Sequence, residues 1–125
     1  MMNFIFLITM IFCHIVDDYY LQGWLASAKQ KSWWKKNSPD KLYRHDYIAA
    51  LFMHSFSWSF MIMLVPTVYK IIVGGTYYPL VFIFNVLIHI FTDNLKANAK
   101  KINLIQDQLI HLCQIIVTWY IFFLR

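Results

Sequence analysis

The sequence predicts an all-α fold, an integral membrane four-helix bundle with a polar His/Asp core in its cytoplasmic half. Three observations support this prediction. Of the 125 residues, 60% are hydrophobic and 14% are charged, whereas soluble domains have about 45–50% apolar and about 25% charged residues. Apolar runs of helix length recur along the chain, and histidines and aspartates lie inside these runs. Because a domain of this size leaves roughly a third of its unfolded-chain surface exposed, the composition excludes a soluble globule, a disordered chain and a disulfide scaffold.

The apolar runs supply the helices of a single transmembrane domain that covers residues 1–125. Each run approaches the ~20 residues that cross about 30 Å of hydrocarbon, and the chain lacks the alternating pattern of barrel strands. The predicted helices cover about residues 3–26, 46–65, 78–97 and 104–124, with a basic loop at 27–45.

Local signals set the ends of these helices. No basic stretch precedes the first run, and the small-residue triplet 26–28 lies too far behind its apolar part for a signal-peptidase site, so we expect an uncleaved span. Pro66 is expected to end the second helix. Gly74, Gly75 and Pro79 are expected to lead into the third helix.

The distribution of basic residues predicts the orientation. Nine of the eleven Lys and Arg residues lie in or beside the first-to-second and third-to-fourth connections, and only Lys70 and Arg125 lie on the other side. By the positive-inside rule, the basic loops face the cytoplasm and both termini lie outside, in a multi-pass protein of the cytoplasmic (inner) membrane. The expected partners are the lipid bilayer and its anionic headgroups beside these loops, not nucleic acid. Segment 29–36 is interpreted as either an interfacial piece or a solvated loop.

Ionisable residues inside the apolar runs form spaced pairs. Three pairs of His and Asp, each four residues apart, occupy one face of their helix. These pairs are His14–Asp18, His89–Asp93 and Asp107–His111. The second run contains His54 in addition. Because an ionisable group in a spanning helix costs on the order of 2.5–3.5 kcal/mol, each of these residues requires a partner or a function.

The polar residues also share one depth. In the first and third helices, which run inward, the pairs lie in the C-terminal half. In the second and fourth helices, which run outward, His54 and the Asp107–His111 pair lie in the N-terminal half. All four helices therefore present imidazoles and carboxylates in the cytoplasmic half of the bilayer.

Imidazole and carboxylate are common ligands of zinc, manganese and iron, so we expect a divalent transition metal. A metal-dependent hydrolase acting at the cytoplasmic leaflet is the leading hypothesis. The expected metal ligands are His14, Asp18, His54, His89, Asp93, Asp107 and His111. The expected catalytic carboxylates are Asp18, Asp93 and Asp107, with one carboxylate or imidazole free as general base. The residues expected to contact substrate or to orient ligands are Asp17, Gln22, Lys96 and Gln108.

Two other functions fit the same residues. In a non-enzymatic phage or bacterial membrane accessory factor, the His/Asp network only holds the helices together, as a lone His54 would. In a proton or ion conductor, the four helices of one protomer form a narrow conduit, so a homo-oligomer would be needed. Cys13 and Cys113 are interpreted as buried thiols, with a disulfide between them as the alternative.

The same residues resemble the pattern of a family of short bacterial and phage membrane proteins, the domain of unknown function DUF3307. That pattern contains His-x-x-x-Asp-x-x-x-Gln, then a His, then His-x-x-x-Asp-x-x-Lys, and finally Asp-Gln-x-x-His. The matching residues are His14, Asp18, Gln22, His54, His89, Asp93, Lys96, Asp107, Gln108 and His111. The resemblance spans about residues 4–124 and implies a four-helix membrane protein with a polar core. Asp17 departs from the pattern, because a small residue such as Gly is typical there.

Overall fold

The computed structural model describes residues 2–125, and all regular structure in that range is helical, which confirms the all-α prediction. Four long helices form the bundle, with short helical segments between the first two. In chain order the elements are α1 (Met2–Ile15), the π-helix η1 (Val16–Leu21), α2 (Leu25–Ala28), α3 (Lys31–Asn37), the 3-10 helix η2 (Lys41–Tyr43), α4 (Asp46–Val73), α5 (Pro79–Ala97) and α6 (Leu104–Phe123).

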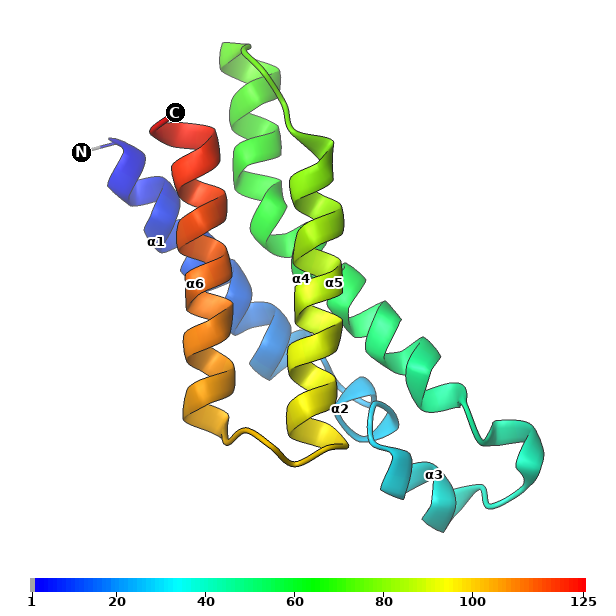
Figure 1. Cartoon of the computed structure of the whole chain (residues 1–125). Coiled ribbons are helices and arrows are strands. Elements are labelled where there is room, and N and C mark those ends of the chain that lie inside the picture. Colours follow the sequence, from blue (N-terminus) through cyan, green and yellow to red (C-terminus); the bar gives the residue numbers. More distant parts are fainter. Residues whose placement is uncertain (1) are drawn as a thin grey trace.

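Both chain ends lie at one end of the bundle, together with the turn between α4 and α5 (Figure 1). The connection between α5 and α6 lies at the opposite end, where α2 and α3 also lie. Two hydrogen bonds join the chain ends. The Asn3 amide donates to the Phe123 carbonyl at 3.2 Å, and the Trp119 indole donates to the Asn3 carbonyl at 2.6 Å. The termini and the basic connections are thus at opposite ends of the bundle.

The first predicted helix, 3–26, is interrupted in the structure. The chain passes from α1 into the π-helix η1, and the helical path then breaks at Gly23, whose φ of +50° lies in the left-handed region. A π-turn widens the helix locally, and Asp17 and Asp18 both turn into the bundle. The spacing of apolar residues in the sequence predicts a continuous helix. It contains no signal for the local widening at η1.

The second predicted helix, 46–65, is longer in the structure. α4 passes through Pro66 and ends at Val73, before Gly74 with a φ of +83°. A proline inside a helix removes one backbone hydrogen bond and bends the axis. Figure 1 shows α4 changing direction near its middle. Pro66 therefore bends this helix, and the expectation that it ends the helix is wrong.

The third and fourth helices begin at recognisable start signals. Pro79 occupies the first turn of α5, where a backbone N–H is not needed. At the start of α6, Asn103 and Gln106 form a reciprocal capping box with hydrogen bonds of 2.9 and 3.0 Å. Both helices begin and end within one residue of the ranges 78–97 and 104–124.

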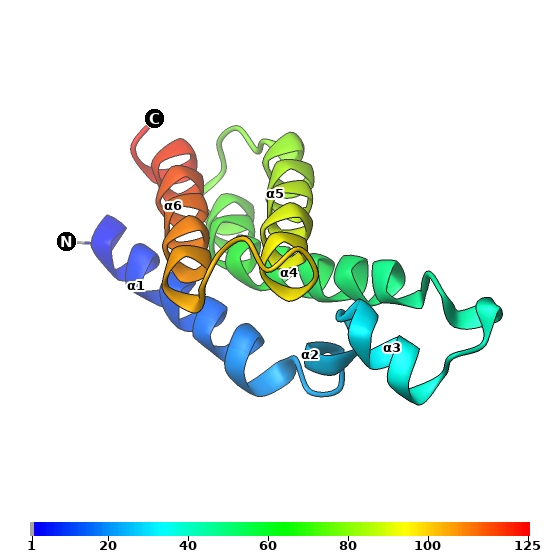
Figure 2. The ribbon, with the colours of Figure 1, turned by 60° about the horizontal axis from the view of Figure 1, so that its bottom comes forward.

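The predicted basic loop, 27–45, forms a partly helical hairpin. It contains α3 and η2 and stands beside the first half of α4 (Figure 2). Trp34 holds the hairpin together, because its indole donates to the Ala28 carbonyl at 2.6 Å and its ring stacks on Tyr43.

Large apolar side chains cover the outside of the bundle. Phe4, Phe12, Ile83, Phe84 and Leu87 are each more than half exposed, whereas the histidines inside the helices are buried. Three helical stretches are long and apolar enough to cross a membrane, namely Met2–Leu21, Lys41–Val73 and Pro79–Ala97. α6 does not meet the same criterion, so only three of the four predicted spans are supported in this way.

An apolar cluster fills the end of the bundle nearer the termini. Its buried members are Met10, Trp58, Ile62, Met63, Ile115 and Phe122. The buried His and Asp side chains begin where the Trp58 ring stacks on His89, with ring centroids 4.3 Å apart. The interior is therefore mainly apolar toward the termini, apart from buried Asn85 and Thr118, and polar toward the basic connections.

Candidate metal centre

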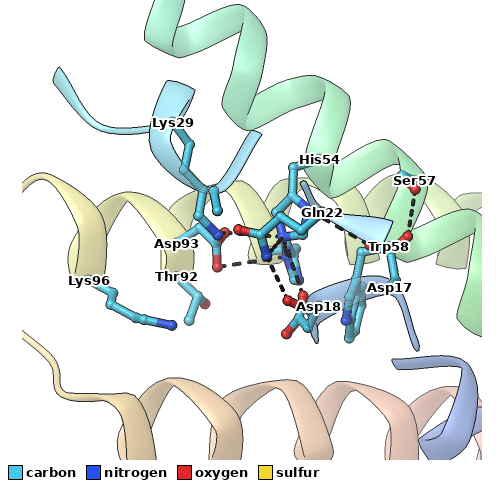
Figure 3. A network of polar contacts seen from close by, with 12 residues as sticks. Asp17, Asp18, Gln22, Lys29, His54, Ser57, Trp58, Thr92, Asp93 and Lys96 are labelled. Atoms are coloured by element: carbon cyan, nitrogen blue, oxygen red, sulfur yellow. Dashed lines mark hydrogen bonds and ion pairs between the residues drawn. The ribbon is translucent and has the colours of Figure 1, made fainter. Parts of the chain in front are cut away.

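His54 lies at the centre of a polar cluster to which η1, α4 and α5 contribute (Figure 3). Its Nε2 atom is 3.3 Å from Asp18 Oδ1, 3.2 Å from His89 Nε2 and 3.4 Å from Asp93 Oδ2. These residues come from separate helical segments and meet around one imidazole nitrogen. The shared depth predicted from the sequence thus corresponds to direct proximity in the structure.

His89 connects the residues around His54 to a second group of side chains, which includes His111 and Asp107 of α6. Its ring lies between Trp58 and His111, with ring centroids 4.3 and 4.2 Å away. His111 Nε2 is 3.4 Å from both Asp93 Oδ1 and Asp107 Oδ1. Two sets of three potential ligands have atoms within 4.8 Å of one another, Asp18–His54–His89 and His89–Asp93–His111.

The spacing of these atoms matches that of ligands around one metal ion. Bonds of 2.0–2.1 Å in a tetrahedral arrangement place neighbouring ligand atoms about 3.3 Å apart, and the three contacts of His54 Nε2 range from 3.2 to 3.4 Å. Asp18 Oδ1, Asp107 Oδ1 and His111 Nε2 are buried without a hydrogen-bond partner among residues 2–125. Because buried polar atoms normally have partners, the residues present fit a cation between them.

Two lysines bind carboxylates at the edge of the cluster. Lys29 Nζ lies 2.6 Å from Asp93 Oδ2, and Lys96 Nζ lies 2.6 Å from Asp107 Oδ2. Lys29 is buried, and no motif in the sequence marks it, since its approach depends on the turn at Gly23. Lys96 is expected from the sequence to contact an anionic substrate group, and in the structure it pairs with an aspartate.

The cluster contains more negative than positive charge. Two lysines face four aspartates, which are Asp17, Asp18, Asp93 and Asp107. With neutral imidazoles, two negative charges therefore remain in a largely buried site. Because uncompensated buried charge is strongly unfavourable, the site requires a divalent cation, or protons on its imidazoles or carboxylates.

His14 lies beside the cluster and belongs to neither set of three potential ligands. Its Nδ1 accepts a hydrogen bond from the Trp58 indole at 2.7 Å. Since an indole can only donate, His14 carries its proton on Nε2 and donates to Gln108 Oε1 at 3.0 Å. Gln108 Nε2 in turn lies 3.1 Å from Asp107 and 3.5 Å from Asp18. His14 thus orients Gln108, which contacts carboxylates of two helices.

Asp17 and Gln22 lie on opposite sides of the His54 ring. Asp17 Oδ1 accepts a hydrogen bond from Ser57 at 2.6 Å, and Asp17 Oδ2 faces His54 Nδ1 at 3.7 Å. This separation is longer than a hydrogen bond, so Asp17 faces the His54 ring without binding it. Gln22 Nε2 donates to the Asp18 carbonyl at 3.1 Å and lies 3.5 Å from His54 Nε2. No spacing motif in the sequence marks Ser57, although it holds Asp17.

A chain of polar side chains orients His111. Gln114 Nε2 donates to the Asn85 carbonyl at 3.1 Å, which leaves Gln114 Oε1 facing His111 Nδ1 at 3.2 Å. Asn85 donates in turn to Thr118 at 2.9 Å. Because an amide oxygen can only accept, His111 Nδ1 carries a proton, and its Nε2 is the atom that faces the carboxylates. The sequence gives no motif for this chain.

A cavity of about 560 Å³ opens beside the cluster, at the end of the bundle that contains the basic connections. Its polar lining residues are Asp18, Gln22, Lys29, Gln30, Asp93, Lys96, Lys100 and Gln108. Two aspartates of the cluster are thus accessible from this cavity, which three lysines also line.

The fold and the cluster define a class of protein, all-helical, with helices of membrane length and a buried His/Asp group that could hold a metal ion. The chain belongs to the family described as "Protein of unknown function (DUF3307)", whose model matches residues 6–125. This match confirms the resemblance found in the His, Asp and Gln pattern. Comparisons with curated proteins and with solved structures give no match.

We expect Lys29→Met to lower the free energy of unfolding by about 3–5 kcal/mol, because it leaves the buried Asp93 carboxylate without its partner. The measurement is a denaturant titration of the purified protein in detergent. Lys29→Met/Asp93→Asn is expected to recover much of the loss, and Lys36→Met, at an exposed position, to change little. A loss below about 0.5 kcal/mol for Lys29→Met, typical of surface substitutions, would contradict a stabilising role for this ion pair.

We expect side-chain ¹⁵N NMR of the protein in detergent to show His111 protonated at Nδ1, because Gln114 offers only an acceptor there. Gln114→Leu removes that acceptor and is expected to leave a mixture of tautomers. Thr92→Val is the control, since the Thr92 hydroxyl bonds only within its own helix, to the Ile88 carbonyl. An unprotonated Nδ1 on His111 in the wild type would rule out the proposed chain of hydrogen bonds.

Proposed function

We propose that this protein is an integral membrane metal-binding protein that acts as a metal-dependent hydrolase on anionic substrates at the cytoplasmic leaflet. One observation carries the proposal. Ligand atoms of Asp18, His54 and His89 converge in a site where lysines pair with only two of four aspartates. One divalent cation would satisfy both the geometry and the charge, and zinc, manganese and iron all suit such nitrogen and oxygen ligands.

Insertion of all four long helices in the membrane is part of the proposal. Large apolar side chains lie outside the bundle and polar ones inside, which is the reverse of a soluble bundle. α6 does not meet the criterion of length and apolarity that the other three meet, but its polar residues Asp107, His111 and Gln114 are buried against the other helices. With the basic connections in the cytoplasm, both termini would lie outside.

The residues have two roles in this mechanism, to hold the cation and to accept a proton. Asp18, His54 and His89 would hold the cation, while Asp93 Oδ2, 3.4 Å from His54 Nε2, is bound to Lys29. A bound divalent cation supplies an activated water at neutral pH. His111 would accept the proton from that water through Nε2, which faces two carboxylates and has no hydrogen-bond partner within residues 2–125.

Substrate would reach the site through the cavity of about 560 Å³. Lys100 lines this cavity, and none of the ion pairs within residues 2–125 involves it. Lys29 and Lys96 also line it but are bound to aspartates, so they reduce the negative charge that an incoming anion would meet. A substrate with a phosphate group, whether in a lipid or free in the cytoplasm, fits this lining.

A purely structural network is the second candidate, and the two short lysine–aspartate pairs favour it. These pairs already neutralise part of the negative charge, and protonated imidazoles could neutralise the rest without a metal. An ion conductor has less support. The buried apolar residues Ile62, Ile115 and Phe122 lie between the polar cluster and the termini, and the polar chain from His111 ends at Thr118, which is itself buried.

We expect the purified protein to contain about one transition metal ion per chain by elemental analysis, because one divalent cation balances the site. His54→Ala and His89→Ala should each remove most of the metal, since each removes a ligand. His45→Ala is the matched control, because His45 is exposed at the start of α4. Metal-free wild-type protein with unchanged stability in chelator would contradict the proposal and favour the structural network.

Hydrolysis is tested on the same proteins with bis-p-nitrophenyl phosphate as the probe, in the presence of zinc, manganese or iron. His111→Gln is expected to lower the rate by about 10²–10⁴-fold, the usual contribution of a general base, while the metal content stays near the wild-type value. If the protein binds metal but does not hydrolyse this or other phosphate esters in a metal-dependent way, the hydrolase activity is rejected and the metal-binding part of the proposal stands.

A further inference from the structure

The hairpin of α3 and η2 encloses a second, separate hollow of about 360 Å³. Four permanently basic side chains line it, Lys31, Lys35, Lys41 and Arg44, and it shares no lining residue with the cavity beside the His/Asp cluster. It therefore lies outside the site described above. Figure 2 shows this hairpin standing out from the bundle beside the first half of α4.

The charge of this hollow is uncompensated. None of the ion pairs within residues 2–125 involves its four basic side chains. Asp40 is the single acidic residue in the lining, and its carboxylate already accepts a hydrogen bond from the Leu42 backbone N–H at 3.2 Å. This differs from Lys29 and Lys96, each of which binds an aspartate at 2.6 Å. The hollow thus has at least three positive charges in excess of its carboxylate, so it attracts an anion.

The walls of the hollow are held in place by aromatic side chains. Trp34 lines it and is fixed by its hydrogen bond to the Ala28 carbonyl and by stacking on Tyr43, with ring centroids 6.4 Å apart. Trp33 and Trp24 pack edge-on against Trp34 at 5.0 and 6.0 Å. These contacts hold together the hairpin that bears the four basic side chains.

Exposed apolar side chains next to the cations indicate that the anion is a lipid headgroup and not a free phosphate ion. Trp24 is 58% exposed and Leu42 is 76% exposed. Indole rings beside lysines and arginines are typical of the membrane interface, where the rings lie at headgroup level and the cations meet lipid phosphates. A free phosphate ion would use the cations but not these apolar surfaces.

We infer that the hollow formed by Lys31, Lys35, Lys41 and Arg44 in the α3–η2 hairpin binds the phosphate headgroup of an anionic phospholipid. Trp24 and Leu42 would enter the interface beside it. The inference rests on the membrane location in the proposed function and is independent of the metal centre. The bound lipid would anchor the hairpin in the leaflet from which the cavity beside the His/Asp cluster opens.

The test is native mass spectrometry of the full chain in a neutral detergent, titrated with phosphatidylglycerol or phosphatidylcholine. Phosphatidylglycerol is expected to bind more tightly, and Lys41→Gln/Arg44→Gln to weaken its binding about thirtyfold, at about five- to sixfold per basic residue lost. Lys36→Gln/Lys101→Gln removes the same charge at exposed positions outside the hollow, and we expect it to keep near wild-type binding.

Three results would overturn the inference: equal binding of the two lipids, equal loss in both double variants, or displacement of the lipid by millimolar inorganic phosphate. The comparison of lipids on the wild-type chain needs no variant, so misfolding of a variant does not decide the outcome. Metal content is measured on the same samples. Lipid selectivity without metal would reject the metal centre alone, and metal without lipid selectivity would reject the lipid site alone.

Discussion

The requirement that buried carboxylates have a compensating charge governs the polar half of this protein. The helices bring four aspartates into an interior that water reaches from one end, and Lys29 and Lys96 each bind one of them at 2.6 Å. The residual charge explains why imidazoles surround the remaining oxygen atoms at 3.3–3.7 Å. Ionised groups at this depth are tolerated only with such partners. The proposed cation is the partner that completes the set.

The side chain behind His111 determines which nitrogen of that ring faces the centre, because Gln114 accepts a hydrogen bond from its Nδ1. His14 differs, because both of its ring nitrogens already have hydrogen-bond partners, Trp58 at Nδ1 and Gln108 at Nε2. Orientation of a ring by a partner on its far nitrogen is the usual arrangement around metal sites. Hydrogen bonding at the ring nitrogens therefore distinguishes the histidines that are able to bind a cation from His14, which supports the site indirectly.

Much of this site was predictable from spacing, and the parts that were not depend on backbone geometry. The i,i+4 pairs and their common depth predict that His54, His89 and Asp93 meet, because helix periodicity fixes the face and the positive-inside rule fixes the direction. The π-helix η1 and the break at Gly23 have no periodic signal, so the inward turn of Asp17 and the approach of Lys29 could not be read from the chain. The extension of α4 through Pro66 could not be predicted either, because a proline inside a helical run bends some helices and ends others.

The central claim, that Asp18, His54 and His89 hold one divalent cation, is tested most directly by X-ray absorption at the zinc edge of protein reconstituted with one equivalent of zinc. The account predicts a shell of nitrogen and oxygen ligands at about 2.0–2.1 Å, with the outer-shell scattering of two imidazoles, and loss of one imidazole in His54→Ala. Zinc surrounded by oxygen alone, or a spectrum that His54→Ala leaves unchanged, would contradict it.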